Sequence, residues 1–181
     1  MSYLGWLLVS LVTVTTAIAA NGEKKVFPLP DKSSLVLTIP VGWKDELKEN
    51  PGSAPASIVL SPRNGTPFQV VVTSVARQRP GASVETAIKM RLSVQQAADK
   101  VKPSAVEPYL SVEELPGAPA PGYYFSATDR EPKPGEYKYL TQGMLLVGDL
   151  VVSFSVLTND GQEKVKDAAL AMLKNASHIT R

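Results

Sequence analysis

The chain has 181 residues, with 19 basic side chains, 17 acidic side chains and one histidine, so its formal net charge is +2. Nearly balanced charge argues against a dedicated nucleic-acid binder, which usually concentrates positive charge in one patch. The absence of cysteine excludes thiol catalysis, thiolate zinc sites and lipid attachment to an N-terminal cysteine.

The first twenty residues carry no charged side chain, and their leucines and valines give way to small residues. This order is typical of a secretory signal peptide. Ala17-Ile18-Ala19 fits the small-x-small rule for cleavage after Ala19, and cleavage after Ala20 is the second choice. The alternative is an uncleaved N-terminal anchor, because an uncharged stretch of about eighteen residues could span a bilayer.

We therefore expect a signal peptide at residues 1–20 and a single mature domain at residues 21–181. The mature protein is expected to be periplasmic or extracellular, with no membrane contact after cleavage.

The mature chain opens on a polar lead, 21–25, and its first expected strand is 34–39, where alternate apolar residues share one face. Trp43 follows in a Gly-Trp step and is expected to pack as a lid over one end of the core. The charged stretch 44–49 is typical of a solvated turn or short helix. A hairpin is then predicted from a strand at 57–60, turn chemistry at Pro62-Arg63-Asn64-Gly65 and a valine-rich strand at 68–76.

A helix is predicted between Ser83, its candidate N-cap, and Pro103, which ends it. Its apolar stripe recurs every three or four residues and comprises Val84, Ala87, Met90, Val94, Ala97 and Val101. A strand at 105–115 and a stiff proline-rich loop at 116–122 follow.

The C-terminal part predicts strands at 123–128, 137–147 and 150–158. Gly148-Asp149 joins the last two as a two-residue turn of type II′, which favours glycine in its first position. Asp160 and Glu163 resemble a capping box ahead of a final helix. The stripe of that helix is Val165, Ala169, Met172 and Ala176.

The strand 150–158 separates two faces by alternation. The face expected to be buried against helices comprises Leu150, Val152, Phe154 and Val156. The other face is half polar and comprises Val151, Ser153, Ser155 and Leu157. Hairpins dominate and βαβ spacing is absent, so the predicted class is α+β, with an antiparallel sheet flanked by helices.

Thr38-Ile39-Pro40-Val41-Gly42-Trp43 resembles the strand, proline and Gly-Trp element of the PsbP-like superfamily, which includes the extrinsic photosystem II subunit and bacterial secreted relatives. The valine-rich strand before a helix, the strand beginning Gly122-Tyr123-Tyr124 and the late hairpin before a helix near Asp160 are also similar. The resemblance covers most of the mature chain by topology. It implies a PsbP-like sandwich and an accessory or interaction role. The metal-linked residues of the plant subunits have no match here, so neither photosynthesis nor metal binding is implied.

Few side chains indicate catalysis. His178 lies three residues from the C-terminus and is expected to be solvated, so a Ser-His-Asp triad or a histidine zinc site is not expected. Glu113 and Glu114 are adjacent on a strand, so they point to opposite faces and form no acid/base pair. The sequence predicts no catalytic, metal-binding or cofactor-binding residue, and no cofactor.

Two groups of residues are candidate partner-binding sites. Arg77 and Arg79 precede the expected helix start at Ser83 and could contact a small anion, with solvation of a strand end as the alternative. The second group sits at alternate positions on two strands joined by the tight turn, and we expect its members to share one exposed sheet face. They are Tyr139, Thr141, Ser153 and Ser155.

The sequence thus predicts a secreted, non-enzymatic accessory or protein-interaction protein, whose partner is another protein outside the cytoplasm and not a nucleic acid. The alternative is a binder of a small apolar or lipid-like ligand in a pocket between sheet and helix. An internal pocket would favour the ligand binder, and a filled core with a flat exposed patch would favour the interaction protein. An enzyme would need a cleft with converging carboxylates.

Overall fold

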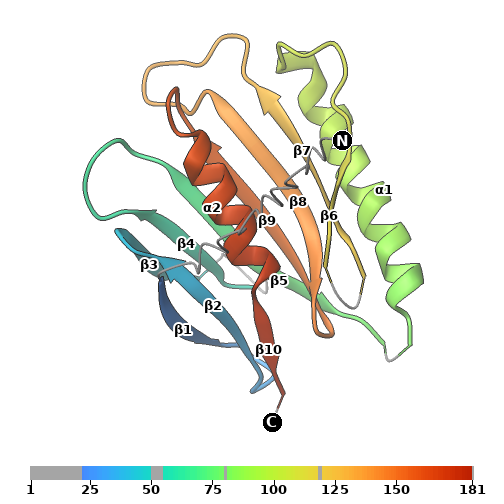
Figure 1. Ribbon diagram of the computed structural model, residues 1–181. Helices are drawn as coiled ribbons and strands as arrows, with labels where there is room; N and C mark the ends of the chain where they lie inside the picture. Colours follow the sequence, from blue (N-terminus) through green and yellow to red (C-terminus); the bar gives the residue numbers. More distant parts are fainter. Residues whose placement is uncertain (1–21, 50–54, 80, 118–119, 181) are drawn as a thin grey trace, which may run out of the picture.

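The computed structural model of the chain describes residues 22–49, 55–79, 81–117 and 120–180 (Figure 1). The expected signal peptide at 1–20 and its cleavage sites lie outside these residues. Within the part of the chain that is described, no helix is long and apolar enough to cross a membrane.

Two antiparallel sheets and two helices give the α+β class expected from the sequence. The small sheet has the order β1-β2-β10, formed by Gly22–Pro28, Ser34–Pro40 and Ser177–Ile179. The large sheet has seven strands in the order β3-β4-β5-β9-β8-β7-β6. In that order the strands are Trp43–Lys48, Ser57–Pro62, Gln69–Arg77, Leu150–Thr158, Tyr139–Val147, Gly122–Thr128 and Glu113–Leu115. The helices are α1, Ser83–Val101, and α2, Glu163–Lys174, with a short 3₁₀ turn at Lys102–Ser104.

The large sheet is the central layer of the molecule (Figure 1). Helix α1 packs against β7 and β8 on one face, over a core that includes Phe125 and Val94. Helix α2 packs against β9 and β2, so α2 and the small sheet together cover the other face. Burial of apolar side chains on both faces therefore holds three layers together.

The expected burial of one face of β9 is confirmed. Its four apolar residues are each at most 2% exposed and face the core beneath α2: Leu150, Val152, Phe154 and Val156. The turn before β9 also fits, because Gly148 has a φ of +62°, as the first position of a type II′ turn requires. The packing of Trp43 against the core is confirmed, since its buried ring lies 4.7 Å from that of Phe68, centroid to centroid.

The structure contains three strands that the sequence did not predict. β1 occupies the polar lead, β3 occupies the charged stretch expected to be a turn or short helix, and β10 lies near the C-terminus. All three are edge strands with mostly exposed side chains, so they lack the apolar alternation that marks a strand. Conversely, the strand expected at 105–115 is limited to Glu113–Leu115.

Both helix starts differ from expectation. The N-cap of α1 is Ala82, Ser83 is already helical, and the cap has no side-chain hydrogen bond. The stripe of α1 is also shifted, because Val84 is exposed while Ala98 is buried.

Helix α2 begins after Gln162 and not after Asp160. Asp160 instead accepts hydrogen bonds from Lys138 and Tyr139, so its carboxylate does not cap the helix. The buried stripe of α2 contains Ala169 and Met172 as expected, whereas Ala176 lies beyond its end.

Candidate functional site

An apolar cavity of about 490 Å³ lies between the small sheet and the large sheet. One wall contains Phe27 and Leu35, which are paired across β1 and β2. The opposite wall contains Leu47, Ile58 and Val72, which lie side by side on β3, β4 and β5. Directly paired residues of antiparallel strands face the same side, so these three form one row facing the small sheet.

The cavity is open to solvent at its rim. Ile58 and Val72 at its floor are at most 3% exposed, whereas Leu47 is 49% exposed and Val75 is 41% exposed. The rim therefore presents apolar side chains to water although the floor is part of the core. A ligand that covered the rim would remove this apolar surface from solvent.

A cluster of four polar side chains lies at one end of the cavity, and we call it the Arg77 cluster: Asp31, Arg77, Asp149 and His178. Asp31 and Arg77 also line the cavity itself. Arg77 Nε lies 3.3 Å from Asp31 Oδ2 and 3.2 Å from Asp149 Oδ2. His178 Nδ1 lies 2.5 Å from Asp149 Oδ1. The cluster joins the β1–β2 turn, the end of β5, the β8–β9 turn and β10.

His178 is a buried member of this cluster, so the expectation of a solvated terminal histidine is wrong. Its side chain is only 3% exposed. Arg77 Nη2 lies 3.2 Å from His178 Nε2, and because a guanidinium only donates, Nε2 accepts this hydrogen bond. The proton shared with Asp149 is then carried by Nδ1. This histidine connects the C-terminal strand to the turn before β9.

Asp31 is held in its charged form by its surroundings. The Ser33 hydroxyl and the Ser33 backbone N–H both donate to its carboxylate, at 2.6 and 3.0 Å. These hydrogen bonds, helped by the charge of Arg77, keep the pKa of Asp31 below its usual value. The polar end of the cavity therefore offers an ionised carboxylate next to a guanidinium.

The expected patch of four residues on one sheet face does not form. Tyr139 and Thr141 are paired with Thr158 and Val156, on the face covered by α2. The two serines of β9 lie on the opposite face of the sheet: Ser153 pairs with Met144 and Ser155 with Gln142. The structure thus separates the four residues into two pairs.

Arg77 and Arg79 do lie together near the start of α1, beside a hollow of about 250 Å³ that Glu85 and Lys89 also line. The Arg77 guanidinium is already neutralised by Asp31 and Asp149. Both arginines are exposed, and Arg77 is the one whose charge is balanced by two carboxylates.

The adjacent carboxylates of β6 do not converge on one site. Glu113 and Glu114 are paired with successive residues of β7, so they face opposite sides as expected, and Glu113 accepts a hydrogen bond from Tyr124. In the described residues no group of three or more His, Asp or Glu side chains is arranged to hold a metal ion.

Sequence reasoning missed Asp31 and Asp149, and it assigned His178 to solvent. The sequence indicates only a turn position for Asp149, and no motif or periodicity marks Asp31 as a functional residue. Comparisons with known protein families and with curated proteins found no match to this chain. The PsbP-like resemblance therefore stays a prediction.

Proposed function

We propose that the protein is a secreted binder of a small apolar or lipid-like ligand, held in the cavity between the two sheets. The observation that carries this proposal is an apolar cavity of about 490 Å³ whose rim is open to solvent. Small-molecule sites typically measure ~300–1,000 Å³ and combine an apolar lining with a few polar groups. The site differs from the pocket between sheet and helix that the sequence suggested.

The Arg77 cluster limits the polar group that such a ligand can carry. Arg77 contacts two carboxylates, those of Asp31 and Asp149, so the positive charge is already balanced. A ligand carboxylate would add a further negative charge, whereas a hydroxyl could donate to Asp31 and accept from Arg77. A long-chain alcohol should therefore bind better than the acid of equal length.

Displacement of a neutral fluorescent probe, N-phenyl-1-naphthylamine, tests this proposal. Decanol should displace the probe saturably, and decanoate should do so more weakly. Leu47→Lys places a charge at the rim and should weaken decanol binding at least tenfold. Leu92→Lys is the matched control, because Leu92 is an exposed leucine on α1 outside the cavity. Absence of probe binding, or equal loss in both variants, would overturn the proposal.

A second candidate is the accessory or protein-interaction role expected from the sequence. It is favoured by a ridge of three apolar residues on the outer side of α1, at successive helical turns: Val84, Ile88 and Leu92. Each is more than half exposed. The same two variants separate the candidates, since Leu92→Lys should weaken capture of a protein partner and Leu47→Lys should leave it unchanged.

A further inference from the structure

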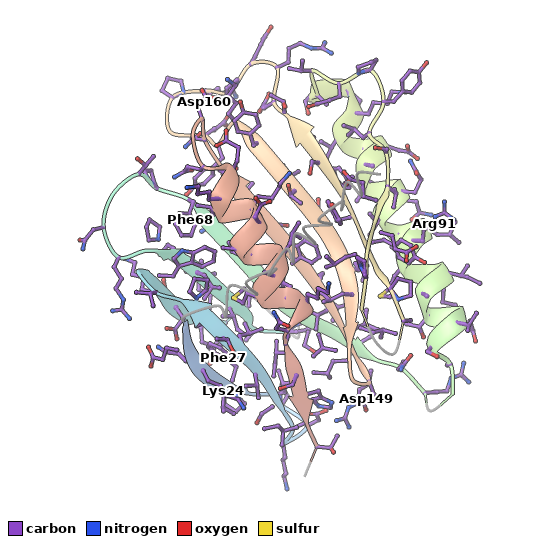
Figure 2. The ribbon with its side chains drawn as sticks, in the orientation of Figure 1. Lys24, Phe27, Phe68, Arg91, Asp149 and Asp160 are labelled. Carbon is purple, nitrogen blue, oxygen red and sulfur yellow. The ribbon has the colours of Figure 1, made fainter. Side chains whose placement is uncertain are left out.

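A hollow of about 250 Å³ lies beside the start of α2, and we call it the hydroxyl hollow. It shares no lining residue with the apolar cavity. Asp160 next to this hollow and Asp149 of the Arg77 cluster lie at opposite ends of the large sheet (Figure 2). A ligand of the hydroxyl hollow would therefore be independent of the function proposed above.

The floor of the hydroxyl hollow is a polar section of an otherwise apolar sheet face. Under α2 this face carries residues such as Phe154 and Val152. Towards the hollow, five hydroxyl side chains replace them on β7, β8 and β9: Ser126, Thr128, Tyr139, Thr141 and Thr158. Two of the four residues predicted to bind a partner, Tyr139 and Thr141, are among these five.

Thr158 presents its hydroxyl to the hollow. The residue as a whole is only 7% exposed, but its hydroxyl is not among the buried polar atoms of the described residues that lack a partner, so it can be reached from the hollow. By contrast, the neighbouring hydroxyls of Ser126 and Thr141 satisfy each other at 2.9 Å. The Thr158 hydroxyl can both donate and accept, so it is available to a polar group that enters the hollow.

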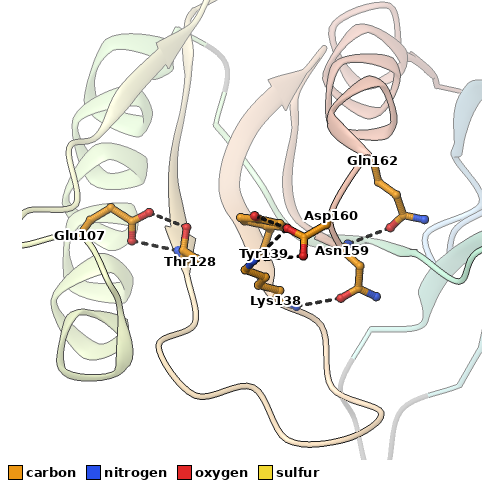
Figure 3. A network of polar contacts seen from close by, with 7 residues as sticks. All are labelled: Glu107, Thr128, Lys138, Tyr139, Asn159, Asp160 and Gln162. Atoms are coloured by element: carbon orange, nitrogen blue, oxygen red, sulfur yellow. Dashed lines mark hydrogen bonds and ion pairs between the residues drawn. The ribbon is translucent and has the colours of Figure 1, made fainter.

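Glu107 supplies an acceptor on one side of the hollow (Figure 3). Its two carboxylate oxygens accept hydrogen bonds from the Thr128 hydroxyl, at 2.7 Å, and the Thr128 backbone N–H, at 2.9 Å. Burial by itself would raise the pKa of Glu107, but these hydrogen bonds outweigh burial and lower it. The carboxylate is thus ionised and keeps lone pairs that a ligand can use.

The opposite side of the hollow offers donors and a second carboxylate. Asn159 Oδ1 accepts from the Lys138 backbone N–H at 3.1 Å, which leaves the amide NH₂ available to donate (Figure 3). Lys166 and Glu163 of α2 also line the hollow, and neither forms an ion pair within the described part of the chain. The rim is ordered by Asp160, which accepts from the Tyr139 hydroxyl at 2.6 Å.

This donor and acceptor set points to one class of ligand. A simple anion would use only the donors and a simple cation only the acceptors, whereas the hydroxyls of a sugar donate and accept at once. The volume of about 250 Å³ corresponds to roughly eight water molecules at ~30 Å³ each, which is room for one six-membered sugar ring. We propose that the hydroxyl hollow binds a single pyranose ring of a neutral sugar.

Nuclear magnetic resonance titration of the mature protein tests this proposal. The probes are the methyl glycosides of glucose, galactose, mannose and N-acetylglucosamine. At least one should cause saturable shifts of backbone amides in β7, β8 and β9 near the hollow. No saturable shifts with any of the four, or shifts confined to the apolar cavity, would overturn the proposal. So would saturation of the hollow by glycine or sulfate without sugar binding.

Thr158→Val tests the role of the Thr158 hydroxyl directly. It should weaken binding of the best glycoside about tenfold and leave the melting temperature unchanged or raised, because no protein hydrogen bond is lost. Thr38→Val is the matched control, since Thr38 is a half-buried strand threonine outside the hollow. If Thr158→Val unfolds, Lys166→Met removes a donor from the α2 side and should also weaken binding. Wild-type affinity in the folded variants would overturn the proposal.

Discussion

Replacing Phe154 with alanine should remove a large, fully buried aromatic ring from the core beneath α2. Phe154 is 2% exposed and lies on β9, paired with Val72 of β5 and Gly143 of β8. A Cβ on Gly143 would lie 2.7 Å from Phe154 Cζ, which shows that the phenyl ring covers this glycine. Because Gly143 has no side chain, it cannot fill the space that the ring leaves.

The expected cost follows from this packing. Deleting a buried phenylalanine ring costs about 3–5 kcal/mol, and more where the surroundings cannot collapse. A domain has only about 5–15 kcal/mol of stability, so Phe154→Ala should remove a large share. At roughly 2–4 °C per kcal/mol for a protein of this size, the melting temperature should fall by about 6–20 °C.

Urea unfolding, followed by the fluorescence of Trp43, measures this cost because Trp43 belongs to the same core cluster. The slope of the unfolding free energy against urea concentration should stay unchanged, because the variant exposes the same surface area when it unfolds. Leu92→Ala is the control, because Leu92 is exposed and its removal should change stability by less than about 0.5 kcal/mol. A loss below about 1 kcal/mol for Phe154→Ala would refute the central position of this ring.

Three other predictions concern ionisation, a turn and export. Burial, with a hydrogen bond to a neighbouring carboxylate, raises the pKa of Tyr124 to about 12, so absorbance titration should show one late tyrosine that Tyr124→Phe removes. Because folding raises this pKa, the stability it contributes is present below about pH 10 and is lost as the pH rises towards 12. Gly148→Ala should lower the free energy of unfolding, measured in urea, by about 1–2 kcal/mol. The reason is that Gly148 has a φ of +62° and an added Cβ would lie 3.1 Å from His178 Cβ. An unchanged urea midpoint would contradict this. Mass spectrometry of the exported protein should find a mature chain beginning at Ala20 or Asn21, and an intact first residue on membrane-bound protein would disprove cleavage.

The separation of the four predicted binding residues could have been derived from the sequence. A two-residue turn at 148–149 places Val147 opposite Leu150. Odd-numbered residues of β8 therefore share a face with even-numbered residues of β9, which parts Tyr139 from Ser153. The alternation along each strand and the length of the turn together determine which residues share a face.

The Arg77 cluster could not be derived in the same way. Its members come from four segments that meet only because β5 pairs with β9 and β10 pairs with β2. Local periodicity and turn chemistry carry no information on which distant strands pair. The apolar cavity has the same origin, since it lies between two sheets and has no signature in any single strand. The α+β class, in contrast, follows from hairpins and alternation that are local.

The strand orders of the two sheets have a consequence for how the chain folds. β1 to β5 come from the first half of the chain and β6 to β10 from the second, yet each sheet contains strands from both halves. The seam between β5 and β9 brings together residues 80 positions apart, such as Ser153 and Thr73. Closing such loops is entropically costly and slows folding. The small sheet is complete only when Ser177–Ile179 is available, so the chain should reach its folded state only after β10 has been synthesised and can pair with β2.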